Sequence, residues 1–183
     1  MNKTLSLKTT IAIAALLALP LAQAATMSKL DYKTGKARIA AEYKTDKAAC
    51  ASFSANAKDI CLQQAKAKDR VALAELEFGY TSEPADQTKI LVAKAESTYA
   101  VAKEKCDDQA GNAKDVCVKE AKAVEVKSLA DARLGQKIGQ ATTDASDAKR
   151  EADYQVAAER CDALAGDAKN ACIVDAKAQF GKT

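Results

Sequence analysis

The sequence contains no histidine and no tryptophan, and only 4% of its 183 residues are aromatic. Without histidine, catalytic triads and most general-base arrangements lose their usual member. A zinc site also loses its usual nitrogen ligand, and the cysteines lack CxxC-type spacing. The seven glycines are scattered, so no glycine-rich phosphate loop is present. We therefore expect no enzymatic activity, no cofactor and no metal site.

Large apolar side chains are also scarce. After residue 24, Leu, Ile, Val and Phe make up about 16% of the chain, whereas alanine makes up nearly a quarter. Alanine has the highest helix propensity, but burying its methyl group contributes little hydrophobic free energy. The composition predicts an all-α chain that is strongly helical and weakly stabilised by its core.

The chain has no large excess of charge of one sign. It contains 28 Lys and Arg against 25 Asp and Glu, and loss of Lys3 and Lys8 would leave a net charge near +1. Acidic and basic residues alternate along the sequence, as in "AKEKCDDQ". Because nucleic-acid-binding proteins carry a basic patch, we expect no nucleic-acid partner.

Residues 1–24 have the layout of a secretory signal peptide. Two lysines precede the apolar run "IAIAALLALPL", and the small residues Ala22 and Ala24 follow it. About eleven apolar residues are too few to cross a bilayer, which needs roughly 20, and no later run is longer. We expect cleavage near Ala24, export to the periplasm, and no transmembrane segment in the mature chain.

Six cysteines form three pairs, and the two members of each pair are eleven positions apart. The pairs recur every 55 or 56 residues, and a tyrosine precedes each first cysteine by seven positions. This spacing indicates three tandem repeats, at 25–79, 80–135 and 136–183. The repeated residues are Tyr43, Cys50 and Cys61; Tyr99, Cys106 and Cys117; and Tyr154, Cys161 and Cys172.

An even number of cysteines after an export signal favours disulfides. On one straight helix, cysteines eleven positions apart would lie about 16 Å from each other, whereas a disulfide needs Cα atoms roughly 4.4–6.8 Å apart. Pairing within a repeat therefore requires the chain to reverse, and each repeat becomes an antiparallel helical hairpin. Bridges between repeats or chains, and thiols that serve as ligands or redox centres, are the alternatives.

Glycine and Asx residues in the middle of each cysteine pair predict how the chain turns. Gly111 and Gly166 are expected to end a helix in the left-handed conformation, and Asn112 and Asp167 to cap the next helix. The first repeat has Ala55 in place of the glycine. Alanine adopts the left-handed conformation at a cost of roughly 1 kcal/mol, so we expect a slightly different turn there, in which Asn56 can adopt this conformation instead.

The apolar spacing predicts six helices, with breaks at 79–86, which contains Pro84, and at 135–139, "GQKIG". Two glycines cost only about 1 kcal/mol each, so one continuous helix through the second break is the alternative. The pattern does not decide between a loose bundle and a jointed array. We expect the repeated tyrosines to pack over the disulfides. The predicted helices span 28–54, 57–78, 86–110, 113–134, 140–165 and 168–179.

The segment "EADYQVAAERCDALAGDAKNACIVDAKAQFGK" (151–182) resembles the repeated segment of exported Ala/Lys-rich proteobacterial proteins, often labelled TolA-like or cell-envelope biogenesis proteins. The resemblance covers all three cysteine modules and implies residence in the cell envelope. Together these observations favour a non-enzymatic structural or interaction protein with envelope partners. The alternative is a stress protectant that resembles late-embryogenesis-abundant proteins, with helices that fold conditionally. The oligomeric state is left open.

Overall fold

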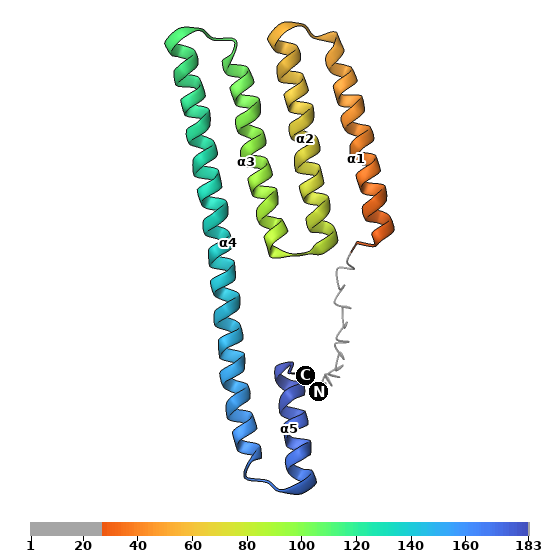
Figure 1. The fold of residues 1–183 in the computed structure, drawn as a ribbon, viewed down its shortest axis with the longest axis vertical. Helices are drawn as coiled ribbons and strands as arrows, with labels where there is room; N and C mark the ends of the chain where they lie inside the picture. The colour runs from red at the N-terminus through yellow and green to blue at the C-terminus, as the bar shows by residue number, and fades with distance from the viewer. Residues whose placement is uncertain (1–26, 183) are drawn as a thin grey trace, which may run out of the picture.

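The structure, a computed structural model, describes residues 27–182, and within them it is all-α, with no strand (Figure 1). The predicted signal peptide lies outside these residues. Each of the three cysteine modules is a helical hairpin, as the sequence predicts. The elements are α1 (Lys29–Ala49), the 3₁₀ turn η1 (Cys50–Ser52), α2 (Ala55–Thr81), α3 (Pro84–Cys106), α4 (Gly111–Cys161) and α5 (Gly166–Phe180).

The helices form a single open layer. In Figure 1, α1, α2, α3 and the first part of α4 lie side by side, and α5 lies beside the far end of α4. Within the described chain, each α-helix packs only against the helices that precede and follow it in sequence. A closed bundle would bring α1 against α4. The chain therefore adopts the jointed array rather than the bundle, and both faces of the layer are uncovered.

The predicted break at 135–139 is wrong, because α4 is one helix of 51 residues that runs through it. At 1.5 Å per residue, α4 is about 76 Å long. Neither Gly135 nor Gly139 has a positive φ. Two glycines weaken a helix by about 2 kcal/mol together, and this cost does not end a helix whose flanking segments are strongly helical.

The middle of α4 has no tertiary partner. Every residue from 133 to 150 is exposed, which corresponds to five turns of bare helix between the second hairpin and the third. Side-chain bonds within the helix support it: the Gln140 amide donates to Asp144 at 2.8 Å, and Arg150 pairs with Asp147 at 2.5 Å. Such pairs each contribute about 0.2–0.5 kcal/mol.

The buried core is thin. Ile39, at 3% exposure, is the only large aliphatic side chain among the buried residues of the described chain, and the other buried hydrophobic residues are alanines and cysteines. Small residues let the helices approach closely. At Gly35 of α1, for example, an added Cβ would lie 2.6 Å from Leu76 Cδ1 of α2. The side chains that are almost completely buried are those of Cys50, Cys106 and Cys161.

The connection between α2 and α3 is a two-residue turn inside the predicted break. Ser82 adopts φ +55°, and Pro84 begins α3, where its fixed φ suits the first helical position. The buried carboxylate of Asp86 holds this turn. One oxygen accepts the Thr81 hydroxyl at 2.6 Å, and the other pairs with Lys89 at 2.6 Å.

These two contacts make the turn sensitive to acid. The Lys89 ammonium and the Thr81 hydroxyl lower the pKa of Asp86 below its ordinary value of 3.8. A carboxyl whose pKa falls on folding stabilises the protein above its unfolded pKa, and the stabilisation disappears as pH falls through the folded pKa. We expect Asp86→Asn to lower the melting temperature at pH 7. The difference from the unsubstituted protein should shrink below pH 4, as followed by circular dichroism melts across pH; a constant difference would contradict this role.

Candidate functional site

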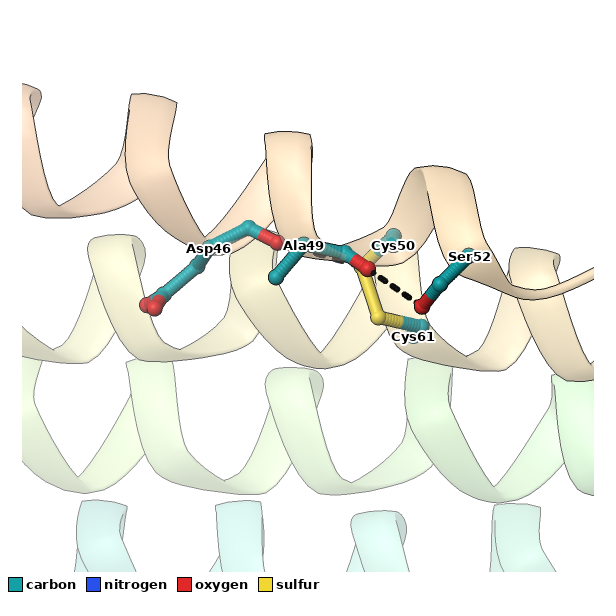
Figure 2. The surroundings of a disulfide bond; sticks show 5 residues. All are labelled: Asp46, Ala49, Cys50, Ser52 and Cys61. Carbon is teal, nitrogen blue, oxygen red and sulfur yellow. Dashed lines mark hydrogen bonds between the residues drawn. A yellow bond between two sulfur atoms is a disulfide. The ribbon is translucent and has the colours of Figure 1, made fainter.

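Three disulfides clasp the hairpins at their tips, and all three join the predicted partners within a repeat. The Cα atoms are 5.6 Å apart for Cys50–Cys61, 5.7 Å for Cys106–Cys117 and 5.6 Å for Cys161–Cys172. No free cysteine occurs in the described chain, which excludes thiol ligands and bridges between repeats there. Figure 2 shows the first clasp, where the Ser52 hydroxyl donates to the Ala49 carbonyl at 2.9 Å and closes the last turn before the loop.

The two cysteines of each clasp differ in burial and in their place along the helices. Cys106 and Cys161 are the last residues of their helices, and Cys50 begins the 3₁₀ turn that follows α1. All three are at most 1% exposed. Their partners lie six residues inside the following helix and are half-buried. A reductant would therefore reach each bridge from the side of the second cysteine.

The predicted roles of the turn residues are partly wrong. The first helix of each hairpin ends four or five residues earlier than predicted, and an extended Ala110 or Ala165 precedes the next helix without a side-chain cap. Gly111 and Gly166 do have positive φ, +55° and +57°, but they begin the second helix instead of ending the first. Asn112 and Asp167 therefore lie inside the helix and are not its caps.

The first tip adopts the same geometry without a glycine. Ala55, five residues after Cys50, has φ +48°, so the expectation that Asn56 would take the left-handed conformation is wrong. In all three repeats the clasped cysteines are eleven positions apart, and the positive φ falls five positions after the first cysteine whatever residue stands there. Alanine is strained in this conformation by roughly 1–2 kcal/mol.

Asn56 has a different function in the structure. Its side-chain amide donates to the Glu104 carbonyl at 3.0 Å and to the Asp108 carboxylate at 2.7 Å. These two bonds join the tip of the first hairpin to the tip of the second. In the other two hairpins an ion pair spans the tip itself, Asp107–Lys114 at 3.0 Å and Asp162–Lys169 at 3.1 Å.

The strain at Ala55 gives a measurable expectation. Ala55→Gly should raise the free energy of unfolding by about 1 kcal/mol, and Gly111→Ala should lower it by a similar amount, because only glycine is unstrained at this φ. Urea unfolding followed by circular dichroism measures both. Gly135→Ala is the matched control: Gly135 lies in open helix without a positive φ, so alanine there should stabilise. Destabilisation by Ala55→Gly would contradict the geometry.

The repeated tyrosines are half-buried, and a lysine ammonium lies over each ring. The distances to the ring centroid are 5.3 Å for Lys47 over Tyr43, 4.8 Å for Lys122 over Tyr99, and 5.8 Å for Lys182 over Tyr154. Cation–π contacts at exposed sites contribute about 0.5–1 kcal/mol. Packing of the rings over the disulfides stays a prediction.

A groove lies between α2 and α3. Its volume is about 490 Å³, within the range of ligand sites. Half-buried apolar side chains form its floor, and three lysines line it without any acidic residue. A second hollow, between α3 and α4, shares Lys94 and Thr98 with the groove, so both open on the same face. The groove is lined by Ala67, Lys68, Val71, Lys94, Ser97, Thr98, Val101, Ala102 and Lys105.

The polar groups of the groove differ in how far they are paired. Lys68 pairs with Asp46 of α1 at 2.8 Å, and Lys94 pairs with Glu75 of α2 at 2.8 Å. Lys105 makes no ion pair within residues 27–182. The Ser97 hydroxyl is buried and has no hydrogen-bond partner among the described residues.

Sequence reasoning missed the groove. Its α3 residues, at 94, 97, 98, 101, 102 and 105, recur every three or four positions and so share one helix face. The residues at 95, 99, 102 and 106 form a neighbouring helical stripe, and Ala102 belongs to both sets. This spacing could have identified one wall of the groove from the sequence. The α2 residues that form the other wall could not be identified until the packing of α2 against α3 was known.

Two other features are absent from the described residues. Nowhere between 27 and 182 do three His, Cys, Asp or Glu side chains gather into a metal-binding cluster. No helix in that part of the chain is long and apolar enough to span a membrane.

No protein-family model matches the sequence, and neither a curated protein nor a solved structure was found to be similar to it.

Proposed function

We propose that the protein is a non-enzymatic interaction protein of the periplasm, whose clasped hairpins present helical surfaces to partners in the cell envelope. The observation that carries the proposal is the single open layer of helices, whose hairpins are each clasped by a disulfide. Most domains bury the apolar side of each helix between two packed layers. Here both faces of one layer stay available for another molecule.

The periplasmic location rests on the cysteines and on residues 1–24. Disulfides form and persist in oxidising compartments, which fits an exported protein. The signal-peptide pattern and the resemblance of 151–182 to exported envelope proteins support the same location.

A conditionally folded stress protectant is the second candidate, and the bare part of α4 favours it. Every residue from 133 to 150 is exposed, and this segment lacks the tertiary packing that supplies most of the stability of helices in proteins. Under this alternative, α4 and its neighbours would become helical only on drying or at a membrane surface.

Circular dichroism of the oxidised mature chain in dilute buffer separates the two candidates. We expect strong helicity and a cooperative thermal transition, because the clasps and the interhelical contacts form in solution. A chain that is disordered in buffer and becomes helical only on drying would exclude the interaction role in favour of the protectant. Recovery of the protein in the periplasmic fraction, with Ala25 at its N-terminus, tests the location.

A further inference from the structure

We infer that the groove between α2 and α3 binds an amphipathic helix whose apolar stripe is flanked by carboxylates. This inference rests on the proposed interaction role and specifies the partner's chemistry. The groove lies between two neighbouring helices of a layer that has no second layer in the described chain. Ridges of one helix fill the grooves between others in ordinary helix packing, so a third helix is the natural occupant.

The dimensions of the groove suit a short helix. On α3 its lining runs from Lys94 to Lys105, which corresponds to three turns, or about 16 Å. Val71 and Val101 form the apolar floor together with two alanines. A partner helix of about three turns would cover this floor with side chains spaced three and four residues apart.

The charges of the groove select an acidic partner. All of its charged residues are lysines, and the free ammonium of Lys105 lies at one end. The stems of the lysines add apolar surface while their ammonium groups stay at the rim. Lys94 and Lys68 already pair with Glu75 and Asp46 from the neighbouring helices, so a partner's carboxylates would share these two lysines and would meet an unpaired ammonium only at Lys105.

A second copy of the chain suits the groove less well. A two-fold interface through this face would bring Lys68, Lys94 and Lys105 of one copy against the same residues of the other. Like charges placed opposite each other across an interface oppose binding. A partner with acidic flanks has the complementary charge.

The test uses the oxidised mature chain and a labelled synthetic peptide of about 16 residues, long enough for the three turns with a spare turn. Its leucines follow helical spacing, and glutamates flank them; a second peptide carries lysine in place of every glutamate. Fluorescence anisotropy should show saturable binding of the glutamate peptide that weakens as salt rises. The lysine peptide should not bind.

Variants of the groove define the site. Lys68→Gln, Lys94→Gln and Lys105→Gln together should weaken binding by roughly 10-fold, since each partly exposed ion pair contributes a few-fold. Glu75→Gln frees Lys94 and should tighten binding about 2-fold, a gain that a merely structural role would not produce. The matched control replaces three lysines that do not line the groove, Lys66, Lys103 and Lys127, and should leave affinity within about 2-fold.

Several results would overturn the inference. Absence of peptide binding by a protein that melts cooperatively would reject it and leave the interaction role standing, whereas a disordered protein would reject that role as well. Equal binding by the triple variant would place the peptide elsewhere. Binding of dodecanoate without binding of the glutamate peptide would identify a lipid site. Dimers in sedimentation that Val101→Asp dissociates would identify a second copy as the occupant.

Discussion

Reduction of the three disulfides should abolish the cooperative folding of this protein. Each clasp closes a loop of about twelve residues, which stabilises the folded state by about 3 kcal/mol in the chain-entropy model. Three clasps contribute about 9 kcal/mol together, comparable to the whole net stability of a typical domain, about 5–15 kcal/mol. The thin alanine core described above cannot replace this contribution.

Circular dichroism melts with and without a thiol reductant measure the effect. Intact mass should rise by about six units on full reduction, one hydrogen for each cysteine sulfur released from its bridge. We expect the oxidised chain to melt cooperatively and the reduced chain to lose most of its helicity at 37 °C. A reduced chain with an unchanged melting temperature would show that the helices hold without the clasps.

Removal of one clasp localises the effect. In the described chain α5 packs only against α4, and its 15 residues are close to the length at which isolated helices become marginal. Cys161→Ala with Cys172→Ala should therefore unfold α5 and leave the first two hairpins intact. Hydrogen exchange resolves the two regions, and loss of protection throughout α2 and α3 would contradict independent hairpins.

Ile39→Ala should produce the largest loss of any single aliphatic truncation in the described chain. Ile39 is 3% exposed, and replacing such a residue with alanine costs 2–5 kcal/mol, so we expect a loss of about 3 kcal/mol. The reason is the lost burial and the cavity left between α1 and α2. Urea unfolding of the oxidised protein measures it.

Ile138 offers a control of the same residue type in the same secondary structure. It is 58% exposed on the bare part of α4, so Ile138→Ala should change the free energy of unfolding by no more than about 0.5 kcal/mol. Higher helix propensity of alanine could even offset the small loss of contact. Equal losses at both positions would mean that another molecule covers Ile138 in solution.

The pairing of the cysteines could be predicted because it depends on local chain geometry. Eleven residues cannot bring Cys106 to Cys117 on one helix, and the export signal made a bridge the natural reason for their spacing. The same argument applied to all three repeats, and it predicted the hairpins correctly.

The continuity of α4 could not be predicted with the same security. Gly135 and Gly139 weaken a helix by an amount that neighbouring turns can offset, so the pattern permitted both a break and a rod. The predicted roles of the turn residues were partly wrong for a related reason. A glycine with positive φ can end one helix or begin the next, and the sequence around Gly111 suits both.

Contacts between hairpins were beyond sequence reasoning altogether. The bonds from Asn56 to Glu104 and Asp108 join residues about 50 positions apart, and nothing in the local pattern of either segment points to the other. The groove has the same origin, because its two walls belong to different repeats. Both depend on how the repeats align side by side.

The exposed middle of α4 sets the distance between the four-helix layer and the third hairpin. Its 18 residues, 133–150, separate the four-helix layer from the third hairpin by about 27 Å of continuous helix. The same helix sets the angle between the two units, because each residue inserted into a helix turns everything beyond it by about 100°. A target that engages both units at once must therefore match a fixed distance and a fixed direction, and two weak contacts would then combine through avidity.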